Sequence, residues 1–372
     1  MNVAIDARPL SDRFPGIGRY LAGLIPALLE AEPALRLTLF ADPAARGGRH
    51  DPFALAGERC VVVPLDAPIF SLRGQLRAAR AIDRGRFDLL HAPYFLSPLG
   101  VRTPVVLTIH DLIPLHHPEI LPSRLARLVT PFLLAAAARS ARRVIAVSQW
   151  VADDLVARGL ADRVAVVHHA ADQLLARAAA ERDPNWPPPP YLLFVGADKP
   201  LKNLPLVVRA YAASRVTVPL VIAGPADPRH RATAETIAAL GLAGRVLMLG
   251  PVPEERLVAL YRGALALLFP SRAEGFGLPP LEAMQLGVPV VCSTAMALPE
   301  VVGNAALLVP PDDEAGWARA ITRIVEDGAL RAALAAAGRA RAKQFSWAAA
   351  ARQTLAVYRE AARGEAARSA FP

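Results

Sequence analysis

Two glutamates, Glu274 and Glu282, lie in the segment SRAEGFGLPPLEAMQLGVPVVCS, which spans residues 271–293. Gly275, Gly277 and a Pro-Pro pair stand between them. An ionised carboxylate only accepts hydrogen bonds, so these side chains suit a ligand that is rich in hydroxyl donors. The glycines allow such a ligand to approach the backbone closely. The segment therefore combines acceptors for hydroxyl groups with accessible backbone N–H groups.

A short helix is predicted directly after the second glycine. Pro279–Pro280 favour the first helical positions, because the N–H that proline lacks would have no helical partner there, and Gly287 is typical of the residue that follows a helix. In this interpretation Glu282 lies in the first turn and Glu274 in the loop before it. A helix N-terminus favours phosphate groups, so the whole segment suits a sugar nucleotide. The plainer alternative is that Glu282 complements the helix dipole and Glu274 is solvated.

The elements that must position this segment are short apolar runs that alternate with helical patterns. Their β-branched and aliphatic residues and their spacing favour βα units in a parallel sheet. We expect strands at residues 2–5, 37–41, 59–65, 88–92, 104–111, 143–148 and 163–169 and, beyond the proline-rich segment 183–190, at 191–196, 219–225, 245–250, 264–270 and 288–293. The sequence therefore predicts two doubly wound α/β halves joined by a hinge, with ligands at the carboxyl ends of the strands.

The composition is that of a folded protein large enough for two domains. The chain has 372 residues, of which 53% are hydrophobic and 20% are charged. It has no uninterrupted apolar run of about 18 residues or more, its start reads as a strand rather than a secretory leader, and its two cysteines are far apart in sequence. These features predict a cytoplasmic protein. The net charge of +9 is dispersed and lacks interleaved aromatics, which argues against binding of nucleic acid.

A basic stripe is predicted on one helix of the first half. Its members recur at helical spacing and are Arg73, Arg77, Arg80 and Arg84. Leu72 and Leu76 lie beside the stripe. The combination favours peripheral binding to the anionic inner face of the cell membrane. The alternative is a helix face that is simply exposed to solvent. The stretch 121–143 has five arginines and no acidic residue, but Pro131 and its alanines predict a packed helix with a basic end.

Further candidates follow the expected strands of the first half. Gly16 and Gly18 follow the first strand, where they could form a loop for a phosphate or an acceptor, although Gly-x-Gly is also common in plain turns. Arg19 could reach an anion there or form a surface ion pair. His110 and Asp111 end the strand at 104–111. A histidine at the carboxyl end of a strand lies near the expected site, and Asp111 could orient it or bind acceptor hydroxyls.

The motifs together resemble glycosyltransferase family 4 over nearly the whole chain. They are IDARPL with GIGRY (16–20), TIHDLIPL (108–115), VSQWVADDL (147–155), FVGADKPLKNL (194–204), the segment 271–293 and LPEVVGNAALLV (298–309). The resemblance implies the GT-B fold, in which two Rossmann-like doubly wound domains face each other across a cleft. The expected domains are an N-terminal acceptor domain at 1–175, a hinge at 176–190, a nucleotide-sugar donor domain at 191–344 and a C-terminal helix at 345–372 that crosses back to the first domain.

The resemblance also implies which residues bind the donor. Glu274 would contact hydroxyls of the transferred sugar, and Glu282 would bind the ribose of the nucleotide. Base selection would occur near Val252. The glycine-rich loops would hold the sugar and diphosphate through Gly16, Gly18, Gly275, Phe276, Gly277 and Leu278.

The phosphate-facing loop departs from the family pattern. Lys202 of the KN motif would neutralise the diphosphate. The family usually has a second basic residue in this loop, whereas this chain has Leu201 and Ala197 at those places. Lys199 is the candidate substitute, but an ammonium group cannot reproduce the bidentate contact of a guanidinium group.

The expected reaction is transfer of a hexose with retention of anomeric configuration. No Asp-x-Asp motif is present, so we expect no metal ion and no cofactor beyond the donor substrate, for which GDP-mannose is favoured over UDP-sugars. The catalytic candidates are Glu274, Lys202 and His110, and the candidates for binding a saccharide or lipid-linked acceptor are Arg19, Tyr94, His110 and Asp111. A non-catalytic binder of sugar nucleotides, a phosphorylase and an epimerase with the same fold are the alternatives.

Overall fold

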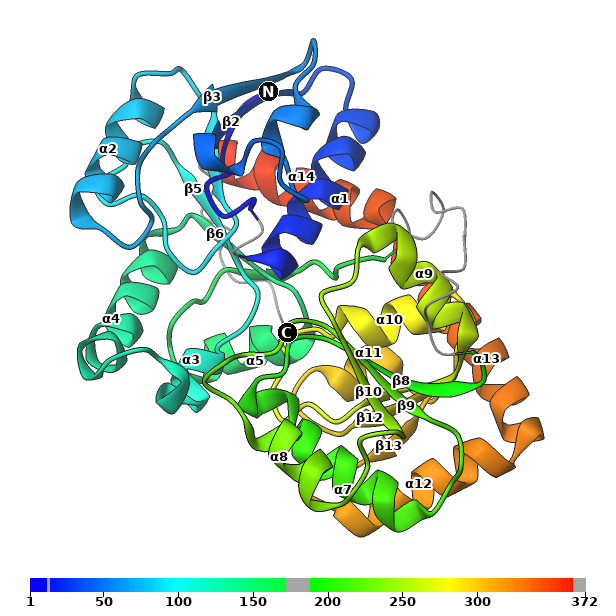
Figure 1. Cartoon of the computed structure of the whole chain (residues 1–372). Helices are drawn as coiled ribbons and strands as arrows, with labels where there is room; N and C mark the ends of the chain where they lie inside the picture. The colour runs from blue at the N-terminus through cyan, green and yellow to red at the C-terminus, as the bar shows by residue number, and fades with distance from the viewer. Residues whose placement is uncertain (12–13, 172–187, 364–372) are drawn as a thin grey trace. The chain divides into compact units, whose positions relative to one another are not determined.

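The computed structural model describes residues 1–11, 14–171 and 188–363. Contacts divide the chain into unit 1, which comprises Met1–His169 and Trp347–Pro372, and unit 2, which comprises Ala170–Ser346. Most of the hinge expected at 176–190 lies outside the described residues. The chain thus builds unit 2 as one continuous segment and then returns to unit 1 with its last helix (Figure 1).

Unit 1 contains a seven-stranded parallel sheet in the order β3-β2-β1-β4-β5-β6-β7. The strands are β1 (Asn2–Asp6), β2 (Arg36–Ala41), β3 (Cys60–Pro64), β4 (Leu89–Ala92), β5 (Val105–Ile109), β6 (Arg143–Ala146) and β7 (Val164–Val166). All residues of β4 and β5 are buried, which explains why these strands appear in the sequence as apolar runs and not as alternating patterns. The chain order reverses between β1 and β4, so the switch point of this doubly wound sheet lies there.

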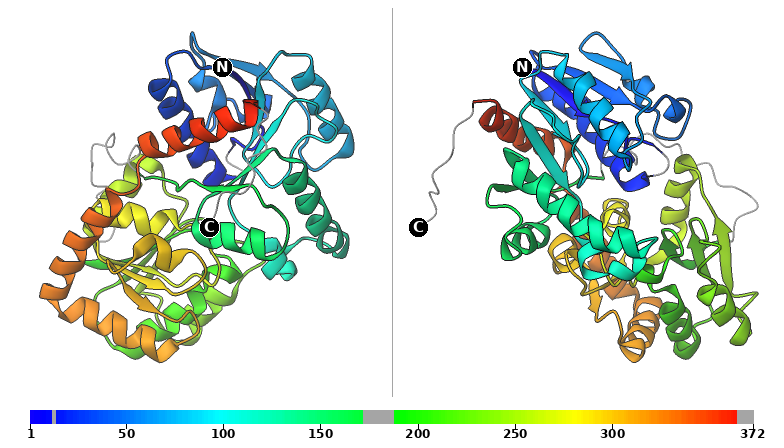
Figure 2. Two further views of the ribbon diagram at one scale, coloured as in Figure 1. Left: turned by 180° about the vertical axis from the view of Figure 1, so that it is seen from behind. Right: turned by 90° about the vertical axis from the view of Figure 1, so that its left-hand side faces the viewer.

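Helices and short 3₁₀ turns connect these strands. They are α1 (Pro15–Ala31), η1 (Pro43–Ala45), η2 (Pro52–Leu55), α2 (Leu72–Asp83), α3 (Ile113–His116), η3 (Pro118–Ile120), α4 (Arg124–Ser140), α5 (Gln149–Ala157) and α14 (Trp347–Arg363). Ser71, Ser123 and Ser148 cap α2, α4 and α5 by accepting a hydrogen bond from a backbone N–H of the first turn. The last helix, α14, packs beside α1 (Figure 2). A Cβ atom on Gly23 would lie 2.1 Å from the Trp347 ring, so only glycine fits there.

Unit 2 contains a six-stranded parallel sheet in the order β10-β9-β8-β11-β12-β13. The strands are β8 (Tyr191–Val195), β9 (Leu220–Ala223), β10 (Val246–Gly250), β11 (Ala264–Phe269), β12 (Val290–Ser293) and β13 (Leu307–Val309). The helices are η4 (Pro200–Lys202), α7 (Leu204–Ser214), α8 (Ala232–Ala239), α9 (Glu254–Gly263), α10 (Leu278–Gln285), α11 (Leu298–Val302), α12 (Glu314–Glu326) and α13 (Gly328–Ala342). Trp317, Tyr211 and Phe194 are among the large side chains of its core.

The two sheets confirm the prediction of two doubly wound α/β domains. Each expected run forms a strand close to its expected position, and β13 is an additional strand that the sequence analysis did not predict. In unit 2 the chain order reverses between β8 and β11, so this unit repeats the strand order of unit 1. Among the described residues, no helix is both long enough and apolar enough to cross a membrane.

Candidate functional site

The switch point of unit 2 brings together two loops that the sequence separates. Lys202 ends η4 in the loop that follows β8, and Glu274 lies in the loop that follows β11. These two strands are neighbours in the sheet and are parallel, so their carboxyl ends lie at the same edge. In open α/β sheets, ligands bind at this point.

One backbone contact joins the two loops, because the Arg272 N–H donates to the Leu201 carbonyl over 2.8 Å. A side-chain contact ties the first loop to the segment after β13: Asn203, with a left-handed backbone conformation and φ of 57°, donates through its amide to the Pro311 carbonyl over 2.7 Å. These contacts help to fix the loops that carry Lys202 and Glu274.

Lys202 Nζ donates a hydrogen bond to Glu274 Oε1 and forms an ion pair with it. The two side chains are 24% and 14% exposed, so solvent reaches both. Lys202 Nζ also lies 5.3 Å from the centroid of the Phe269 ring. Burial and, to a smaller extent, the charge of Glu274 raise the pKa of the Cys292 thiol. The site thus presents a cation beside a carboxylate, which suits a ligand with an anionic group next to hydroxyl groups.

The turn that follows Glu274 depends on glycine. Gly277 has φ of 105°, a conformation that other residues adopt only with strain. A Cβ atom on it would also lie 2.6 Å from Leu298 Cδ2. The preceding Phe276 is buried, with its ring centroid 5.8 Å from that of Phe345. Close packing on both sides fixes the turn, so its backbone has a defined position before any ligand binds.

The start of α10 corrects one detail of the prediction. The helix begins at Leu278, immediately after the left-handed Gly277, and Glu282 is therefore its fifth residue and lies beyond the first turn. Glu282 is only 3% exposed, and its Oε2 accepts a hydrogen bond from the Tyr261 hydroxyl over 2.8 Å. Tyr261 lies on α9 and is fully buried. A protein contact thus orients this carboxylate, and the ribose contact stays a prediction.

Two further residues of unit 2 that were predicted to bind the donor are more exposed to solvent than Glu282. Val252 is half-buried just after β10, and Lys199 is exposed just before η4. A side-chain hydrogen bond from Arg229 is the main cause that lowers the pKa of Asp227 to about 2, and the charge of Lys199 is a smaller cause. Lys199 thus lies near an acidic side chain in an exposed part of the loop.

In unit 1 the two glycines lie in a helix and not in a loop, which corrects the prediction. Gly16 and Gly18 belong to the first turn of α1, which begins at Pro15. Gly18 is buried, and a Cβ atom on it would lie 2.4 Å from the imidazole ring of His50. Gly16 is exposed, with open space where a Cβ atom would be. Packing therefore accounts for Gly18, whereas nothing in the packing requires Gly16 to be glycine.

His110 follows β5 directly and is half-buried. Its Nε2 lies 3.0 Å from the Pro93 carbonyl and donates to it. Burial lowers the pKa of His110 to about 4, against a smaller opposing effect of this hydrogen bond. The ring is therefore neutral at pH 7, and its Nδ1 carries no proton and is an acceptor. The ring also packs edge-on against Tyr20, with 5.0 Å between the centroids.

The other acceptor candidates have clear protein contacts. Asp111 accepts a hydrogen bond from the backbone N–H of Ile113 over 3.0 Å and so helps to begin α3. Tyr94 follows β4 and packs against three aromatic rings, Phe14, Phe70 and Phe95. Arg19 is half-buried on α1, just beyond its first turn.

A buried chain of hydrogen bonds in unit 1 was missed by the sequence analysis. It joins Tyr358 to His91 Nδ1 over 2.6 Å, His91 Nε2 to Thr108 over 2.7 Å and Thr108 to Tyr20 over 3.2 Å. Burial and, to a smaller extent, the charge of His110 lower the pKa of His91 to about 3. The strand position of His91 was visible in the sequence, but its partner on α14 lies 267 positions away.

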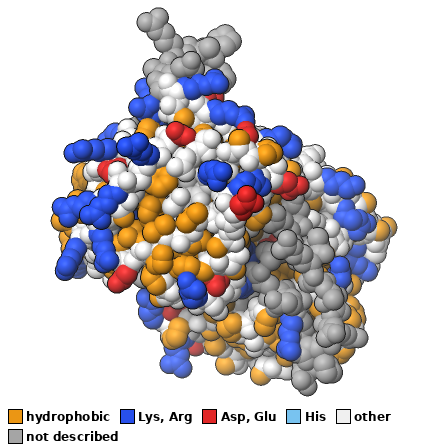
Figure 3. Space-filling model, turned by 90° about the horizontal axis from the view of Figure 1, so that it is seen from above, with side chains coloured by type: hydrophobic (Ala, Val, Ile, Leu, Met, Phe, Trp, Pro, Cys, Tyr) orange, Lys and Arg blue, Asp and Glu red, His pale blue; other side chains and the backbone are white. Residues whose placement is uncertain are grey.

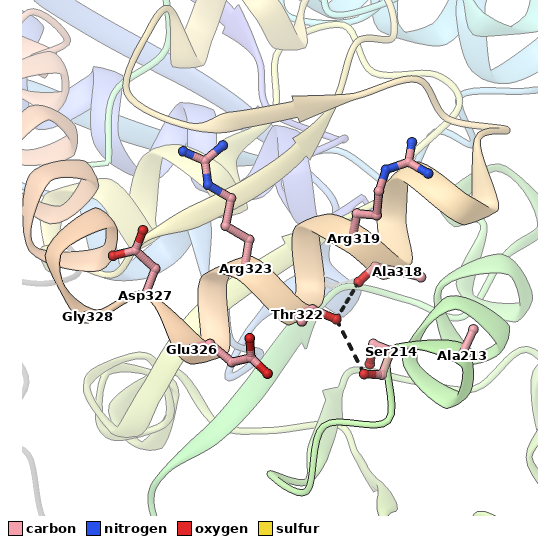
Figure 4. Close-up of a pocket in the computed structure, with 9 residues that line it drawn as sticks. All are labelled: Ala213, Ser214, Ala318, Arg319, Thr322, Arg323, Glu326, Asp327 and Gly328. Atoms are coloured by element: carbon pink, nitrogen blue, oxygen red, sulfur yellow. Dashed lines mark hydrogen bonds between the residues drawn. The ribbon is translucent and has the colours of Figure 1, made fainter.

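A separate hollow on unit 2 lies between α7 and α12 (Figure 4). It contains Ser214, at the end of α7, so it lies away from the loops that follow β8 and β11. Arg319 and Arg323 extend from α12 on the side away from Ser214, and Thr322 donates to the Ser214 carbonyl over 3.3 Å. Its charged groups do not converge, so we assign it no chemistry. No group of three metal-ligating side chains occurs among residues 1–11, 14–171 and 188–363.

Family models match both parts of the chain. The model of glycosyltransferase family 4 matches residues 15–173, and the model of group 1 glycosyl transferases matches residues 177–341. The chain is 30% identical to O-antigen chain mannosyltransferase B of Escherichia coli, over 96% of this chain and 100% of that relative. It is 33% identical to D-inositol 3-phosphate glycosyltransferase of Salinispora tropica, over 77% of this chain and 67% of that relative.

Solved structures share the fold along nearly the whole chain. Sucrose-phosphate synthase of Thermosynechococcus elongatus has a TM-score of 0.75 at 22% identity and covers 98% of this chain and 100% of its own. HepE of Anabaena in complex with UDP and glucose has a TM-score of 0.73 at 22% identity, over 96% and 99%. WaaG, a glycosyltransferase involved in lipopolysaccharide biosynthesis, has a TM-score of 0.69 at 14% identity, over 96% and 99%. At these identities the likeness shows the fold.

Proposed function

The chain belongs to glycosyltransferase family 4 and has the GT-B fold, and from this premise we propose that it transfers mannose from GDP-mannose to a hydroxyl group of a saccharide or lipid-linked acceptor. The family defines the chemistry as glycosyl transfer. The identities of the sugar, the nucleotide and the acceptor are what we propose beyond the family assignment.

One observation carries the proposal, namely the contact between Lys202 and Glu274 at the switch point of unit 2. A nucleotide sugar has its negative diphosphate directly next to the hydroxyl-bearing hexose. Lys202 provides positive charge for the diphosphate, and Glu274 provides an acceptor for the hexose hydroxyls. The turn at Gly277, three residues after Glu274, has a backbone that packing fixes, and we propose that its N–H groups contribute to binding of the donor.

We propose a retaining, metal-independent transfer. The acceptor oxygen forms a bond to the anomeric carbon on the face from which the diphosphate leaves, the bond from that carbon to the phosphate oxygen breaks, and the acceptor proton moves to the departing phosphate. Lys202 stabilises the charge that develops on the leaving group. His110 is neutral at pH 7, so we assign it hydrogen bonding to a substrate hydroxyl through Nδ1 rather than charge stabilisation.

The choice of donor draws on the sequence motifs and on the relatives. The Escherichia coli relative is a mannosyltransferase by name. WaaG is a glycosyltransferase by name, and HepE was solved with UDP and glucose. These relatives support a nucleotide-sugar donor and favour mannose without excluding a UDP-sugar. A donor comparison is therefore the direct test.

The test compares GDP-mannose, UDP-glucose and UDP-N-acetylglucosamine by thermal shift and by release of nucleotide diphosphate in the presence of saccharide acceptors. We expect GDP-mannose to raise the melting temperature of the wild type, to raise it less in Glu274→Ala, and to yield GDP only when an acceptor is present. Stabilisation by a UDP-sugar alone would replace the proposed donor, and stabilisation by none of the three would contradict the proposed function.

A second candidate is a non-catalytic binder of sugar nucleotides. The observation that favours it is Leu201, which stands where the family usually has a second basic residue. Such a protein would gain thermal stability with a nucleotide sugar and release no nucleotide diphosphate with any acceptor, so the same experiment separates the two functions.

A further inference from the structure

Helix α4 of unit 1 carries an exposed row of large apolar side chains. Leu125, Leu128 and Phe132 are 69%, 64% and 69% exposed. They occupy positions i, i+3 and i+7 of the helix and therefore form one stripe along its outer side. The packed helix with a basic end that was expected within 121–143 is present, with Thr130 and Leu134 on its buried side and Arg139 in its last turn. The exposed apolar stripe on its other side was not predicted.

The exposed apolar residues of α4 form a row, which differs from the single exposed apolar residues that are common on protein surfaces. Hydrophobic side chains also appear between basic ones on the face shown in Figure 3, and singly exposed apolar residues need no explanation. In α4 the same kind of residue recurs with helical spacing, at the side of the sheet of unit 1 (Figure 1). The stripe is therefore a feature of the helix as a whole.

Basic residues accompany this stripe and outnumber the acidic ones near it, of which the exposed Glu119 before the helix lies near Arg127. Arg124, Arg127 and Arg139 are exposed on α4, and the helix contains no aspartate or glutamate. The exposed side of α4 is thus apolar and positively charged. Its partner must therefore offer apolar groups and negative charge together.

We propose that α4 binds the surface of an anionic lipid bilayer, with Leu128, Phe132 and Leu125 inserted among the acyl chains and the arginines at the level of the lipid phosphates. A helix that lies in a bilayer interface needs only a narrow apolar stripe with flanking basic residues. A stable protein interface needs about 800 Å² on each partner, which one convex helix does not provide. A second copy of this chain is a poor partner, because each copy carries a net charge of +9 and the two would repel each other.

Helix α2 is the natural comparison within the same unit. Its Leu72 and Leu76 are 67% and 40% exposed, but Ala79, about one turn further along the helix, is buried. The apolar stripe of α2 is therefore shorter than that of α4, although its exposed arginines match those of α4 in charge. We assign insertion to α4 and long-range attraction to the arginines of α2.

Vesicle sedimentation with the full chain tests this assignment. The vesicles contain phosphatidylcholine alone or with phosphatidylglycerol, and the variants are Leu128→Ser/Phe132→Ser in α4 and the matched control Leu72→Ser/Leu76→Ser in α2. We expect the wild type to bind only the anionic vesicles, the α4 variant to bind about tenfold or more weakly, and the α2 variant to stay within about threefold of the wild type. Circular dichroism shows whether each variant is folded.

Several outcomes would overturn the proposal. They are no binding of the wild type to anionic vesicles at low salt, undiminished binding of a folded α4 variant, and a larger loss in the α2 variant than in the α4 variant. A concentration-dependent dimer that the α4 substitutions abolish would assign the stripe to a second copy instead. As an independent measurement, Phe132→Trp should show a blue shift of its added emission with anionic vesicles, and no shift would also overturn the proposal. None of these outcomes depends on the proposed glycosyl transfer.

Discussion

The two sheets share the strand order around their switch points, but the charged side chains there differ in exposure. In unit 2 the loops after β8 and β11 bring together Lys202 and Glu274, which solvent reaches. In unit 1 the end of β1 and the loop after it contain the ion pair of Arg8 with Asp6, whose side chains are only 2% and 6% exposed. His110, which follows β5, is neutral and packs its ring against a tyrosine. The same strand order therefore supports an ion pair open to solvent in unit 2, and a buried ion pair together with a neutral histidine in unit 1.

In the proposed function the two units have different tasks. Unit 2 would meet the diphosphate with the cation of Lys202 and with N–H donors at the carboxyl edge of its sheet. His110 of unit 1, which its hydrogen bond to the Pro93 carbonyl orients, would accept a hydrogen bond from a neutral hydroxyl group. Changes in the two units should accordingly affect different measurements, and the following predictions rank those effects by size.

The largest effect is expected from the charged pair of unit 2. Glu274→Ala and Lys202→Ala should each lower the turnover number for sugar transfer by about 100-fold or more, since removal of one such contact costs about 2.7–4 kcal/mol of transition-state stabilisation. Glu326→Ala and Lys343→Ala, which change the same residue types at exposed positions of unit 2, are the controls. Turnover close to that of the wild type in either site variant would remove this pair from the catalytic site.

A smaller effect is expected from the neutral histidines of unit 1. Their folded-state pKa values, about 3 for His91 and about 4 for His110, lie below the unfolded value of about 6.5. The unfolded state therefore binds more protons as the pH falls, and the stability present above about pH 6.5 is lost toward pH 4. For His91 alone the loss between pH 7 and pH 5 should be about 2 kcal/mol. Urea midpoints at pH 7 and pH 5 measure it.

His91→Gln isolates this effect, because it removes the proton that His91 would gain. The pH dependence of its unfolding free energy should be flatter than that of the wild type. Tyr358→Phe is the matched control: it removes a hydrogen bond to the same imidazole and should lower stability by about 1 kcal/mol at both pH values without changing the slope. Equal slopes in the wild type and in His91→Gln would show that His91 titrates normally.

The smallest effect is expected from Lys199. Because its side chain is exposed and lies near Asp227, Lys199→Ala should weaken donor binding by about threefold or less, and the change should shrink as salt is added. Titration calorimetry at low and moderate salt measures it. A loss of more than tenfold would mean that Lys199 does replace the second basic residue of the family.

The sheets could be predicted because each strand is a short apolar run that stands out from its surroundings. β13 was missed because it has three residues and only Val309 is buried, so it offers little pattern. Gly16 and Gly18 were misplaced because Gly-x-Gly is common in turns, whereas a helix that begins at Pro15 includes both. Local pattern thus predicts elements well and their ends less well.

The site was predictable as a set of loops but not as a set of contacts. The carboxyl-edge rule selected the loops that carry Lys202 and Glu274. The contact between these residues, which are 72 positions apart, depends on the pairing of Arg272 with Leu201. In the same way, no local pattern could pair His91 with Tyr358. Such contacts depend on the order of the strands in the sheet, and the spacing of apolar runs along a single sequence does not specify that order.

The return of α14 to unit 1 has a consequence for synthesis of the protein on the ribosome. Trp347 fills the space beside Gly23, and Tyr358 forms a hydrogen bond with the fully buried His91, so unit 1 depends on residues that are translated after all of unit 2. Unit 2 is one continuous segment and can complete its own core while α14 is still inside the exit tunnel. Although its first strands emerge earliest, the N-terminal part of the nascent chain is therefore the later of the two to reach its finished form.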